Sequence, residues 1–274
     1  MLKMRLMSIP FFKYHGTGND FILIDNFDGT IKLTEDDIIL MCDRRFGIGS
    51  DGLILLEESK HADYNMVFYN PDASQSFCGN GSRCALAFAL HLKKAKPEGS
   101  FEAIDGIHTY QVLKDTYKMG MRPTGVPKLV ERELETPASL KPEPKHFFLH
   151  TGSPHYIVYC ENVDRVDLYG DAHEIRYSAE YRQAGVNVNF VQRSNDVLYV
   201  RTYERGVEEE TLSCGTGVTA VAISDYQEHG GERFRLINTK GGQLRVEFEP
   251  GNEGYDKIFL EGPAEFVFRG EWEL

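Results

Sequence analysis

Two cysteines stand in a sequence context that suits acid–base chemistry. Cys78 begins the stretch Cys-Gly-Asn-Gly, Cys214 begins Cys-Gly-Thr-Gly, and each precedes small and apolar residues typical of a buried helix. The first N–H groups of a helix lack partners within it and carry partial positive charge, so a thiolate placed there is stabilised. The glycines let the backbone approach a bound anion, such as a substrate carboxylate. The two motifs therefore predict two reactive thiols.

A pair of such thiols suits proton transfer at a stereocentre. One thiolate would remove the α-proton of an amino acid from one face, and the other thiol would protonate the opposite face, which inverts the configuration. Two helix N-termini directed at the α-carboxylate would stabilise the carbanion-like transition state. The motifs lie about half the 274-residue chain apart. We therefore expect each of two similar domains to supply one thiol to a cleft between them.

The elements expected around the motifs follow the same order in both halves. In the first half we expect strands at 11–15, 20–25, 53–57, 64–69, 100–105, 108–113 and 116–121, a helix capped by Thr34, and a buried helix after Cys78. In the second half we expect strands at 147–152, 156–160, 188–192, 197–204, 233–238, 244–249 and 257–261, a helix over 171–182 capped by Asp171, and a buried helix after Cys214. Residues 264–274 read as one more strand. This order predicts a weak internal duplication of two α/β domains rather than one all-parallel doubly wound sheet.

Composition narrows the class of protein. The net charge of −12 argues against a nucleic-acid partner. No apolar run reaches 18 residues, and the start of the chain lacks the pattern of a signal peptide, so we expect neither a membrane span nor export. An odd number of cysteines, five, in a chain without an export signal predicts free thiols in the reducing cytoplasm. No two of them form a Cys-x-x-Cys pair, so we expect no structural zinc or other metal site. Five of the eleven prolines lie between residues 123 and 144, which indicates a domain boundary near residue 123.

Eight stretches together resemble the diaminopimelate epimerase family along the whole chain. They are KYHGTGNDFILID, DRRFGIGSDG, FYNPD, FCGNGSRC, TGSPHY, GVNVNFV, TYERGVEEETLSCGTG and EGPAEFVF. The resemblance implies a cofactor-independent isomerase that interconverts LL- and meso-diaminopimelate in lysine and peptidoglycan-precursor biosynthesis, and a homodimer. It also implies two pseudo-symmetric domains, each a mainly antiparallel sheet around a central buried helix. We expect residues 1–122 with 264–274 to form the first domain and residues 123–263 the second.

The resemblance also assigns roles to individual residues. It makes Cys78 and Cys214 the acid–base thiols and links His155 and Glu204 to catalysis. The implied substrate contacts are Asn19, Asn70, Gly79, Asn80, Ser153, Asn187, Glu204, Arg205, Gly215 and Thr216. These types suit a substrate with two carboxylates and two ammonium groups, because arginine grips a carboxylate and asparagine both donates and accepts. Ser153 departs from the family pattern, in which many relatives have asparagine.

Other interpretations stay open at this stage. Asn19 and Asn70 also suit turns, His155 also suits a surface histidine, and Glu204 with Arg205 also suits an exposed ion pair. A related isomerase of the same fold, of the proline racemase or phenazine-biosynthesis type, would share part of the pattern. A thiol redox protein could pair Cys78 with Cys84, although Cys42, Cys84 and Cys160 read as core residues. A binding module that had lost catalysis would be expected to lose a thiol.

Overall fold

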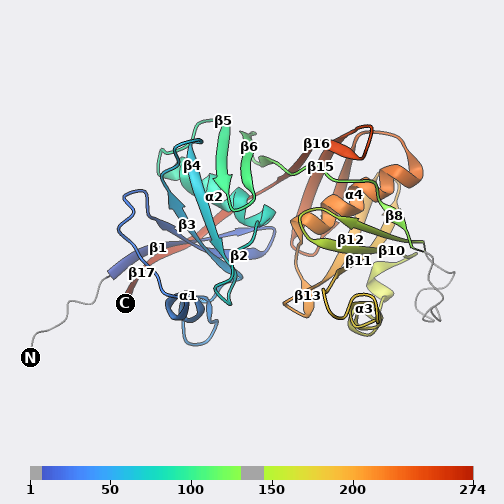
Figure 1. Ribbon diagram of the computed structural model, residues 1–274, viewed down its shortest axis with the longest axis horizontal. Helices are drawn as coiled ribbons and strands as arrows, with labels where there is room; N and C mark the ends of the chain where they lie inside the picture. Colours follow the sequence, from blue (N-terminus) through green and yellow to red (C-terminus); the bar gives the residue numbers. More distant parts are fainter. Residues whose placement is uncertain (1–7, 131–144, 274) are drawn as a thin grey trace, which may run out of the picture. The chain divides into compact units, whose positions relative to one another are not determined.

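The chain folds into two compact units. The computed structural model in Figure 1 describes residues 8–130 and 145–273. Unit 1 comprises Met1–Met119 with Pro263–Leu274, and unit 2 comprises Gly120–Gly262. The sequence placed the boundaries at residues 123 and 264, whereas the units change at residues 120 and 263. Three of the five prolines used for that prediction, at 137, 142 and 144, lie outside the described residues.

In its described residues, 8–119 and 263–273, unit 1 has eight hydrogen-bonded strands and two helices. The strands are β1 (Ser8–Gly16), β2 (Asn19–Asp25), β3 (Gly52–Glu57), β4 (Tyr64–Tyr69), β5 (Glu98–Ala103), β6 (Gly106–Val112), β7 (Tyr117–Gly120) and β17 (Glu265–Glu273). They pair in the order β17-β1-β2-β3-β4-β5-β6-β7, with β2–β3 and β4–β5 parallel and the other pairs antiparallel. Helix α1 (Glu35–Cys42) joins β2 to β3, and helix α2 (Gly79–His91) joins β4 to β5. The last strand of the chain, red in Figure 1, thus pairs with the first, in blue.

Unit 2 repeats this arrangement. Its strands are β8 (Lys128–Leu129), β9 (His146–His150), β10 (Pro154–Tyr159), β11 (Asn187–Ser194), β12 (Val197–Glu204), β13 (Glu209–Thr211), β14 (Phe234–Thr239), β15 (Gly242–Pro250) and β16 (Tyr255–Gly262). They pair in the order β8-β9-β10-β11-β12-β14-β15-β16, with β10–β11 and β12–β14 parallel, and the short β13 also lies along β12. Helix α3 (Leu168–Arg176) joins β10 to β11, and helix α4 (Gly215–His229) follows β13 and precedes β14. Strand order, strand direction and helix position agree between the units, which confirms the predicted duplication and the α/β class.

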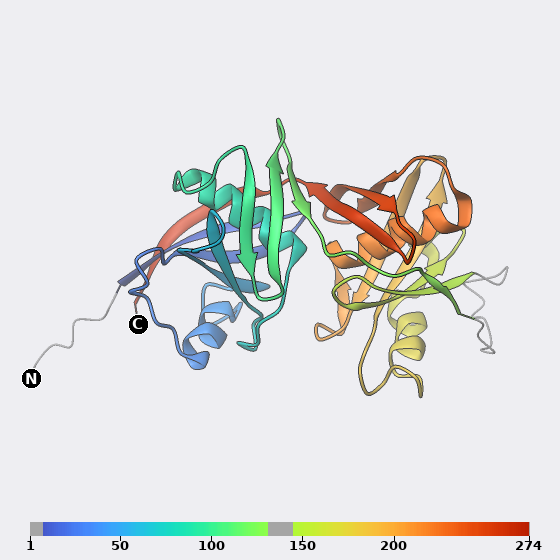
Figure 2. The same cartoon turned by 45° about the horizontal axis from the view of Figure 1, so that its top comes forward.

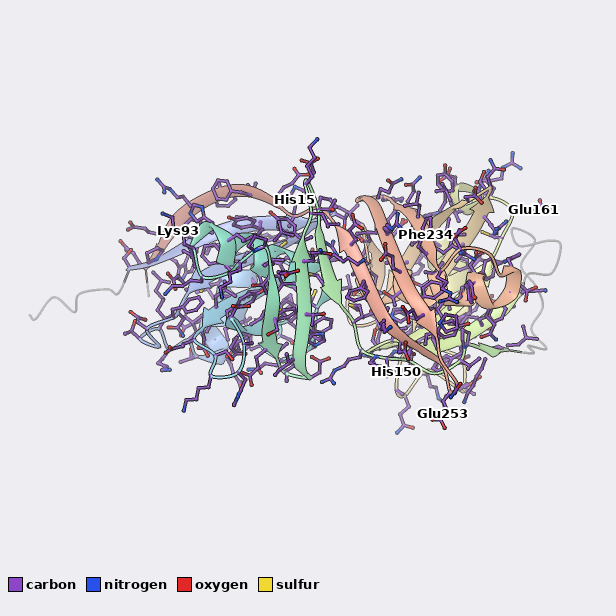
Figure 3. The ribbon with its side chains drawn as sticks, turned by 90° about the horizontal axis from the view of Figure 1, so that it is seen from above. His15, Lys93, His150, Glu161, Phe234 and Glu253 are labelled. Carbon is purple, nitrogen blue, oxygen red and sulfur yellow. The ribbon has the colours of Figure 1, made fainter. Side chains whose placement is uncertain are left out.

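Each central helix lies inside its own unit. The sheet of unit 1 curves around α2, and the sheet of unit 2 curves around α4, as Figures 1 and 2 show. Eleven of the 13 residues of α2 are buried. A second apolar cluster in each unit covers the other sheet face, against α1 in unit 1 and α3 in unit 2. Figure 3 shows side chains filling the space between strands and helices. A helix surrounded by apolar strands is expected to be apolar on all sides, as residues 84–90 of α2 are.

Local sequence signals explain two element boundaries. Thr34 caps α1: its hydroxyl accepts from the N–H of Asp37 at 3.2 Å, and the Asp37 carboxylate accepts from the N–H of Thr34 at 2.8 Å. Thr17 and Gly18 form the tight turn between β1 and β2, with φ of 53° and 84°. Two consecutive positive φ values match the twist of a hairpin and favour glycine. This turn fixes the start of β2 at Asn19.

The predicted cap of α3 is wrong. The helix begins at Leu168 rather than at residue 171, and its cap is Asp167, whose carboxylate accepts from the N–H of Gly170 at 3.3 Å. Asp171 lies in the first turn instead, where a negative charge also favours a helix N-terminus. The helix ends at Arg176, and turns follow as far as residue 184. No helix of the described residues is long and apolar enough to cross a membrane.

Candidate active site

Cys78 caps the central helix of unit 1. It is the N-cap residue of α2, and its sulfur accepts from the N–H of Gly81 at 3.3 Å. Gly79 and Asn80 are the first two helical residues, so their N–H groups lie among those without partners within the helix. The side chain of Cys78 is partly exposed, whereas most of the helix is buried. The thiol therefore occupies the helix terminus that the sequence predicted, where a negative charge is stabilised.

Two asparagines surround this thiol. The Asn80 side-chain amide donates to Asn19 Oδ1 at 3.2 Å, and Cys78 Sγ lies 4.0 Å from the same oxygen. Asn19 Nδ2 in turn donates to a carboxylate oxygen of Asp51 at 2.6 Å. The structure thus brings three predicted residues, Cys78, Asn19 and Asn80, into one group.

Asp51 belongs to a charged cluster that the sequence analysis did not single out. Arg44 bridges the carboxylates of Asp51 and Asp20, at 2.6 Å from each, and Lys13 pairs with Asp20 at 2.5 Å. Hydrogen bonds from Arg44 and Lys13 lower the pKa of Asp20 against the opposing effect of its burial. Arg44 thereby holds the Asp51 carboxylate that orients Asn19, and it links this carboxylate to the Lys13–Asp20 ion pair.

A buried arginine lies within the helix that carries Cys78. Arg83 is fully buried and donates to four neutral oxygens: Gly79 O, Asn80 Oδ1, Thr17 Oγ1 and Pro263 O. Burial lowers the pKa of Arg83 to about 10, which leaves it positively charged at neutral pH. Its bond to Asn80 Oδ1, at 2.9 Å, orients that amide so that its N–H groups point toward Asn19.

Cys214 occupies the equivalent position in unit 2 but has a different partner. It is the N-cap of α4, with Gly215 as the first helical residue, and its sulfur makes no capping bond to a backbone N–H. Instead Cys214 Sγ lies 3.5 Å from the hydroxyl of Thr216. The thiol is buried, whereas Cys78 is partly exposed. The two predicted thiols therefore share a helix position and differ in their immediate surroundings.

The Thr216 hydroxyl connects Cys214 to a histidine. His155 Nε2 lies 2.9 Å from Thr216 Oγ1 and 2.9 Å from Ser153 Oγ, and these two hydroxyl oxygens are 3.1 Å apart. His155 is fully buried on β10, so it is not the surface histidine that was one alternative. Burial lowers its pKa to about 3, with smaller electrostatic contributions from the neighbouring His150 and Arg205. His155 is therefore neutral at physiological pH.

Asn187 joins this group through Ser153. Its amide donates to Ser153 Oγ at 3.3 Å and to Pro154 O at 3.0 Å, and its carbonyl oxygen accepts from the backbone N–H of Arg205 at 2.9 Å. Serine at position 153 therefore supports a hydrogen-bond network here. Five predicted residues of unit 2, Ser153, His155, Asn187, Cys214 and Thr216, form one continuous set of contacts.

The remaining predicted residues lie at the end of a strand or in the turn that follows it. Asn70 follows β4, and its amide donates to Ser74 O and to the hydroxyls of Ser74 and Ser76, so it shapes the loop that leads to Cys78. Glu204 ends β12, and its carbonyl accepts from the N–H of Glu208 at 2.8 Å, which closes the following turn. Arg205 lies in that turn and donates to Ala184 O at 3.0 Å. The Asn70 contacts match the turn role that its sequence also suggested.

Asn189 and Thr202 are buried polar residues that the sequence analysis missed. Asn189 Nδ2 lies 3.2 Å from His155 Nδ1, and Asn189 Oδ1 accepts from Thr202 Oγ1 at 3.0 Å. The signal was present in Gly-Val-Asn-Val-Asn-Phe, in which both asparagines fall on the same face of a strand flanked by valine and phenylalanine. Buried amides at alternate positions indicate a polar network rather than a plain core.

The structure argues against Cys84 as a resolving thiol. Cys84 is fully buried in α2, and burial raises the pKa of its thiol well above the usual value. Six positions along a helix span about 9 Å, beyond the Cα separation of about 7 Å that a disulfide permits. None of the five cysteines, all of which lie in the described residues, forms a disulfide. Cys42 is also buried, and Cys160 packs partly buried against the cluster around α3, in line with the core role predicted for these three.

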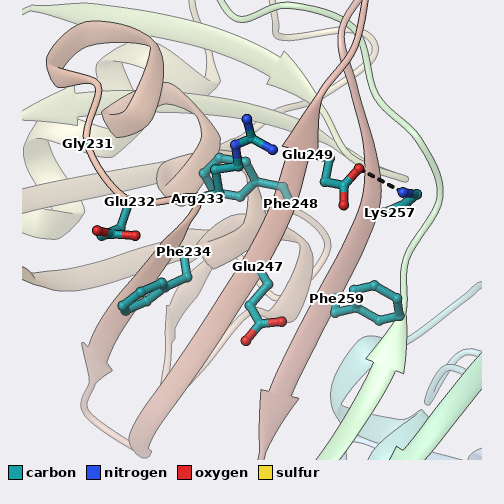
Figure 4. A pocket seen from close by; sticks show the side chains of 9 residues that line it. All are labelled: Gly231, Glu232, Arg233, Phe234, Glu247, Phe248, Glu249, Lys257 and Phe259. Carbon is teal, nitrogen blue, oxygen red and sulfur yellow. Dashed lines mark hydrogen bonds and ion pairs between the residues drawn. The ribbon is translucent and has the colours of Figure 1, made fainter.

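A surface pocket of unit 2 lies apart from these residues. Its lining comes from 231–234, 247–249, Lys257 and Phe259, and Figure 4 shows the Lys257–Glu249 ion pair at its edge, at 2.8 Å. None of the predicted site residues lines it. Within residues 8–130 and 145–273, no three histidine, cysteine or acidic side chains are grouped closely enough to hold a metal ion.

Comparison with known proteins agrees with this arrangement. The family model for diaminopimelate epimerase matches residues 11–130 and 147–267, one segment for each half of the chain. Diaminopimelate epimerase of Flavobacterium psychrophilum is 43% identical over 94% of this chain and 97% of that protein. Diaminopimelate epimerase of Chlorobaculum tepidum is 41% identical over 93% of this chain and 98% of that protein.

A solved structure shows the same fold at low identity. The PhzF-family phenazine biosynthesis protein of Bacillus anthracis has a TM-score of 0.75 and 15% identity, covering 98% of this chain and all of that chain. This likeness concerns the fold alone. The family match over both halves and the identity to full-length relatives show that the chain belongs to the diaminopimelate epimerase family.

Proposed function

We propose that this protein epimerises diaminopimelate between the LL and meso forms, with Cys78 and Cys214 as its two acid–base groups and without a cofactor. The observation that carries the proposal is the duplicated thiol: each unit places one cysteine at the N-cap of its central buried helix. Membership of the family supports the substrate, which is named in the relatives' descriptions.

The proposed reaction is two proton transfers at one carbon. In one direction the thiolate of one cysteine takes the α-proton, and the thiol of the other gives its proton to the opposite face of the same carbon. The base ends as a thiol and the acid as a thiolate, so the atoms and charges balance, and the reverse reaction exchanges the roles. The N–H groups at the starts of α2 and α4 would bind the α-carboxylate and stabilise the negative charge that develops.

Each thiol has an environment that fits this role. Cys78 Sγ already accepts from Gly81 N–H, a bond that strengthens when the acceptor is charged. Cys214 Sγ has the Thr216 hydroxyl at 3.5 Å. The remaining substrate contacts that we propose are Asn19, Asn70, Gly79, Asn80, Ser153, Asn187, Glu204, Arg205, Gly215 and Thr216. Arg205 would bind a carboxylate and Glu204 an ammonium group.

The test is incubation of the reduced protein with LL-diaminopimelate in D2O. Stereoisomers are separated by chiral chromatography, and deuterium is located by mass spectrometry. We expect meso product with one deuterium at the inverted carbon. Absence of conversion, followed by racemisation of proline or another amino acid, would replace this proposal with a related isomerase of the same fold.

We also propose that the protein works as a homodimer in the reducing cytoplasm. The lack of a disulfide among the five cysteines, all within the described residues, supports the compartment. Strand β17 supports the dimer, because Phe266, Val267 and Phe268 are 53%, 50% and 44% exposed in consecutive positions. Sedimentation equilibrium of the wild type and of Val267→Lys tests it. A dimer weakened by the variant is expected, and a wild-type monomer at micromolar concentration would contradict it.

A further inference from the structure

We propose that Asn189 is a positioning residue for Cys214: it fixes the tautomer of His155, and this tautomer directs the Thr216 hydroxyl toward the sulfur. The proposal rests on the role proposed above for Cys214. Asn189 itself reaches the thiol through two other side chains, so it is not a catalytic residue.

The orientation of the Asn189 carboxamide is fixed by its partners. Its Nδ2 donates to Tyr156 O at 3.1 Å, and Thr202 Oγ1 donates to its Oδ1 at 3.0 Å. A backbone carbonyl can only accept, so turning the amide over would lose the bond to Tyr156 and set two oxygens against each other. Asn189 is fully buried, where a lost hydrogen bond is costly because no water replaces it. The second N–H of Nδ2 therefore points toward His155 Nδ1, 3.2 Å away.

This contact determines where the imidazole carries its proton. Because Nδ1 receives an N–H from Asn189, it acts as an acceptor and carries no hydrogen. A neutral imidazole then carries its one hydrogen on Nε2. The complete burial of the ring disfavours a second proton, and so does the proximity of His150 on β9 and Arg205 after β12. His155 thus presents an Nε2–H donor toward Thr216 and Ser153.

The Nε2–H donor of His155 determines which hydrogen bond the Thr216 hydroxyl can make to Cys214 Sγ. Nε2 lies 2.9 Å from both hydroxyl oxygens, and Ser153 Oγ already accepts from Asn187 Nδ2. When Thr216 Oγ1 accepts from Nε2–H, its own hydrogen is available to Cys214 Sγ at 3.5 Å. A thiolate only accepts, so a neighbouring hydroxyl held as a donor favours the thiolate over the thiol. In the opposite tautomer, with the hydrogen on Nδ1, Nε2 would be an acceptor. Thr216 would then donate its hydroxyl hydrogen to Nε2 instead of to the sulfur of Cys214.

The lack of a side chain at Gly217 leaves space for the side chains of Asn189 and His155. A Cβ at position 217 would lie 2.5 Å from Asn189 Oδ1 and 3.3 Å from His155 Cε1. The second glycine of Cys-Gly-Thr-Gly therefore lets the carboxamide and the imidazole pack against the first turn of α4. An apolar residue at position 189 would need no hydrogen-bond partners, whereas the buried amide depends on its directed hydrogen bonds to offset the cost of burial.

The first experiment reads the tautomer directly. The protein is labelled with 15N-histidine, the His155 signal is assigned with His155→Gln, and long-range 1H–15N spectra are recorded between pH 5.5 and 8.5. In the wild type we expect an Nε2-protonated ring that does not titrate. Asn189→Asp replaces the donor at Nδ1 by an acceptor, so we expect protonation at Nδ1. Asn195→Asp, in the turn between β11 and β12, adds the same charge on the same hairpin and should leave the signal unchanged.

The second experiment reads the consequence at the sulfur. The rate of alkylation of each cysteine by iodoacetamide is followed by peptide mass spectrometry across pH. For Asn189→Asp we expect the Cys214 profile to shift upward by about one pH unit, which is about a tenfold lower rate near pH 7. Cys78 serves as the internal comparison and should not change. Thr202→Val removes the donor to Asn189 Oδ1 and should shift Cys214 in the same direction by a smaller factor.

The outcomes separate this proposal from the proposed function, because neither readout uses a substrate. An Nδ1-protonated ring or an imidazolium in the wild type at pH 7.5 would overturn the proposal, as would an unchanged Cys214 profile in folded Asn189→Asp. If Asn189→Asp fails to fold, the Thr202→Val variant provides the test. An alkylation profile of Cys214 in Thr202→Val that equals the wild-type profile would also overturn the proposal. Failure of the epimerase assay would leave both readouts intact.

Discussion

The imidazole of His155 and the thiol of Cys214 meet at one hydroxyl, with Thr216 Oγ1 lying 2.9 Å from Nε2 and 3.5 Å from Sγ. The histidine is neutral and buried, so it influences the thiol through the direction of a hydrogen bond rather than through a charge. In unit 1 the corresponding contact to Cys78 is a backbone N–H, that of Gly81. Two thiols at equivalent helix positions are therefore supported by different groups.

Loss of either thiol should abolish epimerisation. For Cys78→Ala and for Cys214→Ala we expect activity to fall by about 10³-fold or more, because a positioned acid or base contributes about 10²–10⁴-fold and here both are needed. Steady-state assays with LL-diaminopimelate and a circular dichroism melt measure activity and folding. Cys160→Ala, which removes a partly buried thiol of unit 2, is the matched control and should remain active. If Cys78→Ala or Cys214→Ala kept more than a few per cent of the wild-type activity, the two-base mechanism would be contradicted.

Replacing His155 should flatten the pH dependence of stability. The folded pKa of about 3 lies below the ordinary value of 6.5, so the unfolded chain binds an extra proton between these values. The contribution of neutral His155 to the stability of the folded state is therefore complete above pH 6.5 and is lost as the pH falls toward 3. In urea titrations the difference in unfolding free energy between wild type and His155→Gln should shrink by about 1.4 kcal/mol per pH unit below pH 6. Exposed His61→Gln is the control, and a pH-independent difference would contradict the neutral histidine.

Asp51 should matter for catalysis although we do not place it against the substrate. Its carboxylate accepts from Asn19 Nδ2 at 2.6 Å and pairs with Arg44. For Asp51→Ala we expect kcat/KM to fall about 10- to 100-fold, as is typical when the support of a directly acting group is removed. Exposed Asp28→Ala, which removes a carboxylate from a loop of the same unit, should have little effect. Unchanged kcat/KM in Asp51→Ala would mean that Asn19 keeps its orientation without it.

Gly217→Ala should damage the site through packing. The new Cβ would lie 2.5 Å from Asn189 Oδ1, so the carboxamide or the first turn of α4 must move. We expect a destabilisation of about 1–3 kcal/mol, the usual range for overpacking, together with at least a tenfold loss of kcat. Gly125→Ala, at a position with nothing within 4 Å, is the matched control. Wild-type kcat in Gly217→Ala would show that the network tolerates displacement.

The sequence alone predicted those features that depend on a few neighbouring residues. The Thr34–Asp37 capping box and the two thiols at helix N-termini follow from short motifs, and the structure has each of them where it was predicted. The cap of α3 was misplaced by four residues, because Asp167 and Asp171 are both good helix starters and packing of Leu168 against the sheet decides between them.

Contacts between distant strands could not be predicted in the same way. Asp51 reaches Asn19 because β2 and β3 pair in parallel, and Asn189 reaches His155 because β10 and β11 do. Each contact depends on a strand register that no single segment encodes. The alternation of asparagine and valine around Asn189 indicated its face but not its partner.

The pairing of β17 with β1 has a consequence for synthesis of the chain. Unit 2 is continuous from residue 120 to 262, whereas unit 1 lacks an edge strand until residues 265–273 leave the ribosome. Until then one side of β1 exposes unpaired backbone groups while residues 17–264 are synthesised, and such an open edge favours aggregation. A frameshift or stop codon after residue 263 would therefore spare both thiols and every proposed substrate contact. It would nevertheless release a protein whose strand β1 lacks one of its two neighbours.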